Sequence, residues 1–533
     1  MDAHPRVRIA AFNVLAQCLA KSDYFPRAGS ALKWKSRWPA LQRDVMSWRA
    51  DVMSLSEVDR VDEWISFLES HGYATAFKRR GRKAYGQLIA WCFERFELVA
   101  SASADMNDIA DTLSDGTLSE AVIHRLGTPR AAQRDTASEP TPPTTTATTD
   151  ASRTAADTYR TDTVAMFVSL RLRDAPGHGI VVGSTHFYWA PDAGRVRAAQ
   201  AATLQLLTAD TLAAAAAAGA MSHQGPGDCT TRWHVVLGGD YNSRPAHDAY
   251  RVLCGNPLPT GCALPTGQAP PPQLDWDTGV QRGSASAPAS VRSASDVEGG
   301  GGIDATQASD ASPGQAASSD ATPAAEGLQQ SGGDSSTATA QADTTVSNSV
   351  NRAAWRRRLA AHMTRTADAL CCTSTEDRSG ASPASKRDGA RVLRSAYALY
   401  RRGEGTRRIA GAGVACSVDA AAARSAGDGT AGGAVADAVM PTTATTMASL
   451  CDAGQGQCRC CACGDAAWEP EFTTHTGEAG FIDTIDYIFV SDATLTVTDA
   501  MPLPSASAVG AAGAPSAAFP SDHFPLVVEL ALH

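Results

Sequence analysis

The chain has 533 residues, a formal net charge of −10 and 6% aromatic residues. Long stretches consist of Ala, Ser, Thr, Gly and Asp, and such stretches bury too little apolar surface to offset the entropy lost on ordering them. This composition excludes several fully packed domains and predicts one α/β domain interrupted by insertions.

The negative charge is concentrated in one part of the chain. Residues 270–350 hold ten acidic and two basic side chains, whereas residues 1–100 hold sixteen basic and eleven acidic ones. The amino-terminal part includes the basic run Lys78-Arg79-Arg80-Gly81-Arg82-Lys83. Such a run is typical either of a surface that faces a polyanion or of a solvated turn, and charge alone favours neither.

Cysteine usage indicates a reducing compartment, because thirteen cysteines form no small secreted framework. The first predicted strand begins at residue 7, so we expect no apolar signal core before it. We expect an intracellular protein without a membrane-spanning segment, in the cytoplasm or alternatively in the nucleus. Overlapping Cys-x-x-Cys pairs indicate either a zinc site or a reduced loop, and they are formed by Cys458, Cys460, Cys461 and Cys463, with Cys451 upstream.

Apolar periodicity predicts alternating strands and helices. In chain order, strands are expected at 7–12, 51–55, 88–93, 164–170, 180–183 and 234–238. Helices are expected at 34–49, 61–70 and, as an Ala-rich helix, 195–222. This alternation, repeated in two halves of the chain with a similar order of elements, favours an α/β sandwich of two sheets.

Changes in composition divide the chain into five parts. Residues 1–255 are expected to form the first part of the catalytic domain, with a Thr/Pro/Ala linker at 133–157. Residues 391–408 and 468–533 are its return segment and its last part, while 256–390 and 409–467 are low-complexity insertions that we expect to be mostly disordered. Within the first insertion, Trp355-Arg356-Arg357-Arg358 indicates either a contact with RNA or a solvated helix.

Polar side chains follow several predicted strands at the point where each strand ends. They are Asn13, Glu57, His186, Asp240, Asn242, Asp486, Asp522 and His523. Each residue alone is equally typical of a strand-end cap, and Asp240-x-Asn242 is also typical of a turn that caps a helix. Together they supply hard oxygen ligands for Mg²⁺, a carboxylate that can activate water and two imidazoles that can face a phosphate.

The order of these segments resembles the endonuclease/exonuclease/phosphatase superfamily, and within it the carbon-catabolite-repression deadenylases, nocturnin and the Angel proteins. The resemblance covers about residues 6–100, 158–255, 390–402 and 468–531. It rests on Phe12-Asn13, Ser56-Glu57-Val58, Thr185-His186, Gly239-Asp240-Tyr241-Asn242-Ser243, Ile485-Asp486-Tyr487 and Ser521-Asp522-His523. It implies a two-sheet α/β sandwich of the superfamily type with long disordered insertions.

The resemblance also implies a role for each residue. Glu57 and Asn13 would hold Mg²⁺, with Mn²⁺ as the alternative ion, and Asn13 would also orient the phosphate. Asp240 would orient or deprotonate the attacking water, and Asn242 would hold the scissile phosphate. His186 and His523 would donate to phosphate oxygens, Asp486 would fix a histidine tautomer, and Asp522 belongs to the terminal Ser-Asp-His motif.

The segment after His186 bears on the substrate. Thr185-His186-Phe187-Tyr188-Trp189-Ala190-Pro191 is similar to the deadenylases, in which the proline and a later Phe, here Phe481, form the walls of an adenine slot. Stacking in such a slot contributes about 1–3 kcal/mol per base. The alternative is that Pro191 only ends a strand and Phe481 lies in the core.

Nocturnin-like enzymes carry basic residues just after the histidine, whereas Tyr188 and Ala190 are not basic. We therefore expect a 3′–5′ exoribonuclease acting on RNA, with the poly(A) tail as its substrate in mRNA decay. A nucleotide 2′- or 3′-phosphatase is the alternative, and a catalytically silent RNA- or partner-binding protein is the remote one. Protein partners would bind through the insertions, and no membrane is expected.

Three residues depart from the pattern near the expected substrate groove. Ser56 replaces a usual Gln, Tyr85 replaces a usual Asp in the basic loop, and Thr163 stands where Asn is common. None of them removes a predicted metal or water-handling residue, so they bear on specificity rather than on catalysis.

Overall fold

The structure of the protein is a computed structural model. It describes residues 4–126, 155–222, 231–245, 247–255, 258, 280–281, 337–371, 391–402, 468–477, 480–491 and 493–533. The chain divides into one unit formed by 1–282 and 350–533 and a second unit formed by 283–349. All predicted site residues lie in the described part of the first unit.

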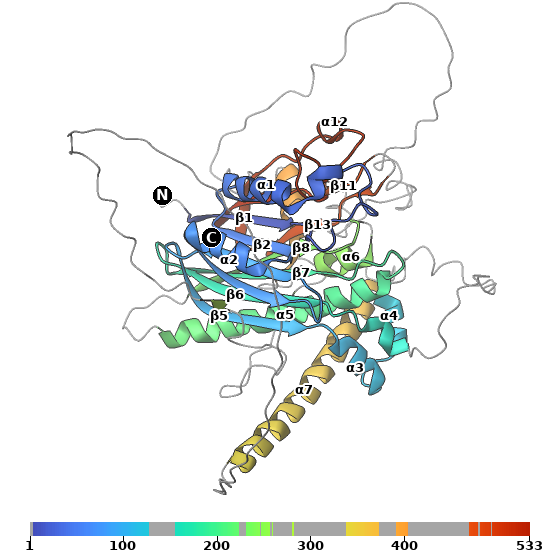
Figure 1. Cartoon of the computed structure of the whole chain (residues 1–533). Coiled ribbons are helices and arrows are strands. Elements are labelled where there is room, and N and C mark those ends of the chain that lie inside the picture. The colour runs from blue at the N-terminus through green and yellow to red at the C-terminus, as the bar shows by residue number, and fades with distance from the viewer. Residues whose placement is uncertain are drawn as a thin grey trace, which may run out of the picture. The chain divides into compact units, whose positions relative to one another are not determined.

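Two large sheets form the centre of the first unit (Figure 1). The first has the order β14-β15-β1-β2-β4-β3-β9, with β1 (Arg6–Asn13), β2 (Val52–Val58), β3 (Tyr73–Arg79), β4 (Gly86–Cys92), β9 (Val280–Gln281), β14 (Leu495–Ala500) and β15 (Leu526–Leu532). The second has the order β10-β13-β8-β7-β6-β5, with β5 (Phe96–Asp105), β6 (Val164–Leu172), β7 (His178–His186), β8 (Arg232–Asp240), β10 (Leu393–Ser395) and β13 (Asp486–Ser491). A small pair joins β11 (Thr474–His475) to β12 (Ile482–Asp483).

The sheets face each other across an apolar core, because successive strand residues point to opposite faces. On β1, Val7 and Ile9 lie in the core that also holds Val182 and Val236 of the second sheet. Phe12, on the opposite face of β1, packs instead beneath helices α1 (Trp34–Ser47) and α2 (Val61–Ser70). The outer face of the second sheet is covered mainly by α5 (Gly194–Ser222) and α6 (Asp248–Gly255). The predicted two-sheet α/β sandwich is confirmed.

Parallel pairing brings four strand ends to the same edge. β1 pairs with β2 in parallel, with Asn13 opposite Ser56, and β7 pairs with β8 in parallel, with His186 opposite Asp240. The carboxyl ends of these strands therefore carry their polar residues to one edge of the sandwich. β13 runs antiparallel to β8 and begins there, with Asp486 opposite Asp240.

The predicted helices and strands match observed ones to within a few residues, whereas other elements were missed. The missed strands are β3, β5, β14, β15 and the short β9 to β12. The missed helices are α3 (Asp108–Ser114), α4 (Glu120–Leu126), α8 (Ala396–Arg401), α12 (Ala506–Val509) and the 3₁₀ turns η1 (Gly29–Leu32) and η2 (Ala155–Tyr159). η2 occupies the end of the predicted linker 133–157. α5 is the one described helix long and apolar enough to cross a membrane, over Gly194–Ala218, but 67% of that window is buried within this fold, as expected for a core helix.

The expectation for residues 256–390 is wrong in one segment. α7 (Thr337–Cys371) buries Trp355, Leu359, Met363 and Ala367 in the core beside α5. These residues recur every fourth position and form one apolar stripe, which is enough to pack a helix against the domain despite its Ala- and Arg-rich background.

The Trp355–Arg358 stretch of α7 is neither a solvated helix nor a free basic surface for RNA, the two expectations from the sequence. Trp355 is buried, Arg356 Nη2 lies 2.6 Å from Asp111 Oδ2, and Arg358 pairs with the buried Asp210. Only Arg357 is exposed to solvent. The stretch therefore anchors α7 to α3 and α5. The cysteine cluster and residues 403–408 lie outside the described residues, as do both predicted insertions except for α7, β9 and Leu258.

Candidate active site

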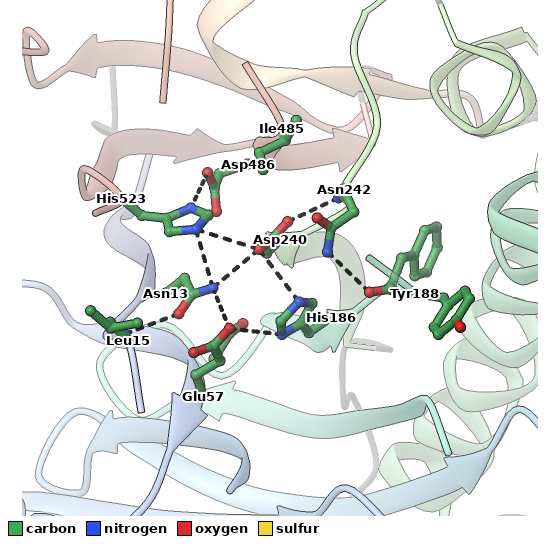
Figure 2. Close-up of polar contacts among 12 residues, drawn as sticks. Asn13, Leu15, Glu57, His186, Tyr188, Asp240, Asn242, Ile485, Asp486 and His523 are labelled. Carbon is green, nitrogen blue, oxygen red and sulfur yellow. Dashed lines mark hydrogen bonds and ion pairs between the residues drawn. The ribbon is translucent and has the colours of Figure 1, made fainter. Parts of the chain in front are cut away.

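Five side chains from distant parts of the sequence meet at the edge where the strands end (Figure 2). Asn13 lies at their centre, and its Nδ2 donates to Glu57 Oε1 and to Asp240 Oδ2, both at 3.1 Å. The same nitrogen lies 3.4 Å from His523 Nε2. The fifth side chain, His186, places Nε2 3.5 Å from Asp240 Oδ2 and Nδ1 3.8 Å from Glu57 Oε1.

The orientation of the Asn13 amide decides what it can do. Its Oδ1 accepts a hydrogen bond from Leu15 N at 3.0 Å, so the nitrogen faces the carboxylates. Asn13 therefore acts as a donor that holds Glu57 and Asp240 in place, whereas the sequence predicted it as a metal ligand beside Glu57.

Glu57 lies at an irregularity of its strand. The pairing of β2 with β4 shifts register between Ser56 and Val58, and Glu57 has a φ of 59° in the left-handed region. A non-glycine residue held there stores about 1–3 kcal/mol of strain and is concentrated at functional sites. The bulge takes the side chain out of the regular alternation, and Oε2 accepts a hydrogen bond from Ala16 N at 3.0 Å.

Arg37 on α1 joins the amino- and carboxyl-terminal parts of the site. Its side chain is fully buried and donates to Val14 O and Leu15 O, both at 2.6 Å, and to Pro520 O at 2.7 Å. The loop after Asn13 is thereby tied to the loop that carries His523. Sequence analysis missed Arg37, although its place on the same helical stripe as Leu41 and Val45 was a signal that it faces inward.

His523 is fixed by a buried carboxylate. Its Nδ1 lies 2.8 Å from Asp486 Oδ2, which also accepts a hydrogen bond from Thr473 Oγ1 at 2.7 Å. Burial opposes a charge on the imidazole, but Asp486 and Asp522 raise the pKa of His523 well above its usual value. His523 is therefore cationic at neutral pH and directs Nε2 toward the site. The predicted pairing of Asp486 with a histidine is present in the structure.

The pKa values of Asp240 and His186 are shifted in opposite directions. Burial and the nearby Asp486 raise the pKa of Asp240 to about 7. Burial, together with Arg80 and His523, lowers the pKa of His186 well below its usual value, so this imidazole is neutral. A carboxylate that titrates near neutral pH is suited to exchange a proton with water.

Asn242 lies beside Asp240 through a turn, the arrangement given as the alternative for Asp240-x-Asn242. β8 ends at Asp240, and Asn242 has a φ of 47°, so the strand alternation expected to align the two side chains does not apply. Instead, Asp240 Oδ1 accepts a hydrogen bond from Asn242 N at 2.9 Å in a turn. The Asn242 amide donates to Phe187 O at 3.1 Å, which holds the loop after His186 beside the site.

Asp522 lies at the edge of the group rather than at its centre. Its Oδ2 is 3.9 Å from His523 Nε2, and burial raises its pKa. Its backbone oxygen accepts hydrogen bonds from His475 N at 3.1 Å and Thr474 Oγ1 at 2.9 Å. The terminal loop is thus attached to β11.

The two residues predicted to bind a base both lie on the surface. Pro191 is exposed in the loop after β7, and Phe481 is 47% exposed just before β12. The alternative in which Phe481 belongs to the core is therefore wrong. Trp189, two residues before Pro191, is 66% exposed and was not singled out by the sequence.

The carboxylates fit a hard divalent cation. Glu57 and Asp240 are buried, and burial followed by a neighbouring carboxylate raises the pKa of each, Asp522 in the case of Glu57 and Asp486 in the case of Asp240. A divalent cation relieves such repulsion, and Mg²⁺ prefers carboxylate oxygens. Asp240, Asp486 and His523 also offer ligand atoms within 4.8 Å of one another.

Sequence comparison identifies relatives of known name, although no family model matches the chain. Probable RNA exonuclease NGL3 of Saccharomyces cerevisiae is 27% identical over 257 residues, which are 47% of this chain and 40% of that protein. Carbon catabolite repressor protein 4 homolog 4 of Arabidopsis thaliana is 28% identical over 272 residues, 48% of this chain and 57% of that protein. This chain is a homologue of the Ccr4, NGL and Angel proteins.

The Ccr4, NGL and Angel homology spans about half the length of these curated relatives. Among solved structures, the human nocturnin catalytic domain aligns with a TM-score of 0.41 and 14% identity over 100% of this chain and 97% of that chain. ANGEL2, described as a 2′,3′-cyclic phosphatase, aligns with a TM-score of 0.42 and 15% identity over 99% and 96%. Likeness at these scores establishes no activity, so a functional assignment depends on sequence homology and on the geometry of the site.

Proposed function

We propose that the chain is a Mg²⁺-dependent phosphodiesterase that removes nucleotides from the 3′ end of RNA and releases 5′-nucleotides. The observation that carries this proposal is the convergence of Asn13, Glu57, His186, Asp240 and His523 at one strand edge. Relatives named as RNA exonucleases supply the substrate class.

Asp240 is the residue placed to handle the attacking water. Asn13 Nδ2 and Asn242 N each hold one of its oxygens, which fixes the direction in which the carboxylate presents its lone pairs. Asp240 accepts a proton as water attacks phosphorus, the bond from phosphorus to the 3′ oxygen breaks, and the shortened RNA leaves with that oxygen. The released nucleotide keeps the 5′-phosphate.

A cationic and a neutral imidazole would stabilise the charge that develops on the phosphoryl oxygens. His523 is held protonated by Asp486, and a fixed cation in a buried site stabilises developing negative charge without reorganising. His186, whose Nε2 lies 3.5 Å from Asp240 Oδ2, is neutral and would donate one hydrogen bond to a phosphoryl oxygen. Glu57 would hold the cation, which, when bound, polarises the phosphate and lowers the pKa of its bound water.

We propose poly(A) as the preferred substrate, because Trp189 and Pro191 follow His186, Phe481 precedes Asp486, and all three are exposed side chains with flat apolar surfaces. Base stacking on such surfaces contributes about 1–3 kcal/mol per base and needs no groove. Tyr188 and Ala190 supply no positive charge for a terminal phosphate group. These features favour a base at the end of RNA over a phosphorylated dinucleotide.

The test uses 5′-labelled RNA that ends in a run of adenosines, incubated with Mg²⁺ or with EDTA. The proposal predicts a Mg²⁺-dependent ladder that shortens through the adenosines with the wild type and with Glu63→Gln, a surface control, but not with Glu57→Gln. Intact RNA together with phosphate release from NADP or a 2′- or 3′-phosphonucleotide would assign the nucleotide-phosphatase function instead. No turnover of either substrate would indicate a catalytically silent protein that binds RNA or a partner.

A further inference from the structure

One member of the basic run 78–83 lies inside the protein while its neighbours lie outside. Arg80 is 3% exposed, whereas Arg79, Arg82 and Lys83 are exposed to solvent. The run forms the connection between β3 and β4, so it is neither wholly a solvated turn nor wholly a surface patch. A buried guanidinium needs partners, because an unpaired buried charge is costly.

The guanidinium of Arg80 has few partners within the described residues. Its Nη2 donates to Thr163 Oγ1 at 3.2 Å, and in this part of the chain it forms no ion pair. Burial lowers the pKa of Arg80, whereas the nearby Tyr85, Glu57 and Asp240 favour its charge, and after burial Arg80 is the main cause that lowers the pKa of His186. Arg80 therefore lies beside the site with most of its five N–H donors uncommitted.

The backbone around Arg80 is built to hold this position. Arg80 N donates to Tyr85 O at 3.1 Å. Gly81 has a φ of 47°, and a Cβ added there would lie 2.7 Å from Asp162 Cβ, so only glycine lets the loop close this tightly onto the neighbouring segment.

Thr163, the partner of Arg80, is itself fixed. Its Oγ1 accepts a second hydrogen bond from the buried Gln200 Nε2 at 3.0 Å. Gln200 Oε1 also accepts from Tyr188 N at 3.0 Å, in the loop that follows His186. The side chain of Arg80 is thus connected through two buried residues to the loop that carries Pro191. Tyr85 and Thr163, two of the three departures from the family pattern, both contact Arg80.

We propose that Arg80 is a further catalytic residue, whose guanidinium donates hydrogen bonds to a non-bridging oxygen of the phosphate being cleaved. This inference rests on the proposed function. The planar fork of arginine matches phosphate geometry, and its charge is maintained at any physiological pH. Arg80 forms no ion pair within the described residues, so an incoming phosphate would supply the anion that its guanidinium binds.

The first test measures binding of inorganic phosphate by calorimetry, which requires no turnover. The wild type and Arg79→Gln, an adjacent exposed arginine, should bind alike, whereas Arg80→Gln should bind at least about tenfold more weakly. Unfolding temperatures establish that the variants fold, and Arg80→Lys replaces Arg80→Gln if the latter does not. Equal phosphate affinity of the wild type and the folded Arg80 variant would overturn the inference.

The second test uses RNA whose terminal linkage carries one phosphorothioate of defined Rp or Sp configuration. Removal of one preorganised donor lowers turnover of the all-oxygen substrate by about 10²–10³-fold. For the one diastereomer in which sulfur replaces the contacted oxygen, the ratio of wild-type to Arg80→Gln rates should shrink to below about tenfold. An equal penalty on all three substrates would indicate a merely structural role and overturn the inference.

The two tests separate this inference from the function on which it rests. Cleavage of RNA by the wild type with unchanged rates for Arg80→Gln would refute the role of Arg80 and leave the proposed function standing. Phosphate binding that depends on Arg80, without cleavage of RNA, would refute the exonuclease and support the anion site.

Discussion

Arg37→Met should destabilise the protein, because Arg37 ties α1 to the loops on both sides of the site. The substitution removes four hydrogen bonds and leaves three buried backbone oxygens, of Val14, Leu15 and Pro520, without their donor. Each unsatisfied buried group costs about 1–3 kcal/mol. Part of this is recovered because the charge is no longer buried, so we expect a net loss of about 3–5 kcal/mol in the free energy of unfolding.

The assay is equilibrium unfolding in urea, monitored by tryptophan fluorescence. Arg43→Met is the matched control, because Arg43 lies on the same helix, is 65% exposed and pairs only with its neighbour Asp44. We expect this control to change the free energy of unfolding by less than about 0.5 kcal/mol. Burial lowers the pKa of Arg37 to about 10, so it stays charged and the comparison holds at neutral pH.

A loss below about 1 kcal/mol for Arg37→Met would refute the reasoning, because it would mean that water or a rearranged loop replaces the missing donors. If Arg37→Met does not fold, Arg37→Lys is measured in its place, because lysine keeps the charge and restores some of the donors. That variant should lie between wild type and Arg37→Met in stability.

Three further predictions rest on named contacts. Trp355→Ala should destabilise the protein by about 3–5 kcal/mol in thermal or urea unfolding, because it leaves a cavity beneath α7; no effect would mean that α7 does not pack on the domain. Asp486→Asn should lower turnover by about 10²–10⁴-fold in single-turnover assays, because His523 loses the carboxylate that fixes its proton and its orientation; a wild-type rate would contradict the role of this pair. Burial and His178 lower the pKa of His234 to about 3. Between pH 6.5 and 3 the unfolded chain therefore binds a proton at this residue that the folded chain does not bind. The free energy of unfolding falls as the pH drops through this range. His234→Asn should flatten this fall by about 1 kcal/mol per pH unit in urea unfolding, and parallel profiles for the two proteins would show that the pair contributes nothing.

The sequence predicts those parts of the site that depend on local pattern. Asn13 and Asp240 each end an apolar run, and strands of this kind place their final residues at a sheet edge irrespective of the next segment. The long helices were predicted for the same reason, because their apolar stripes are local.

Features that depend on tertiary contact were not predictable. The left-handed conformation of Glu57 arises where β2 and β4 fall out of register, and nothing in Ser56-Glu57-Val58 encodes it. Arg37 and Arg80 were charged residues in basic surroundings, and only the folded chain shows that each is buried against the site. α7 was overlooked because its composition resembles the flanking insertion, while four apolar residues determine how it packs.

The central claim is that this site hydrolyses RNA from its 3′ end with a divalent cation, and the identity of the released product tests it most directly. RNA ending in adenosines would be incubated with the wild-type chain in Mg²⁺ or EDTA, and the small products separated by chromatography. The account predicts adenosine 5′-monophosphate in Mg²⁺ and none in EDTA. Release of 3′-nucleotides, of inorganic phosphate alone, or of no product in Mg²⁺ would contradict it.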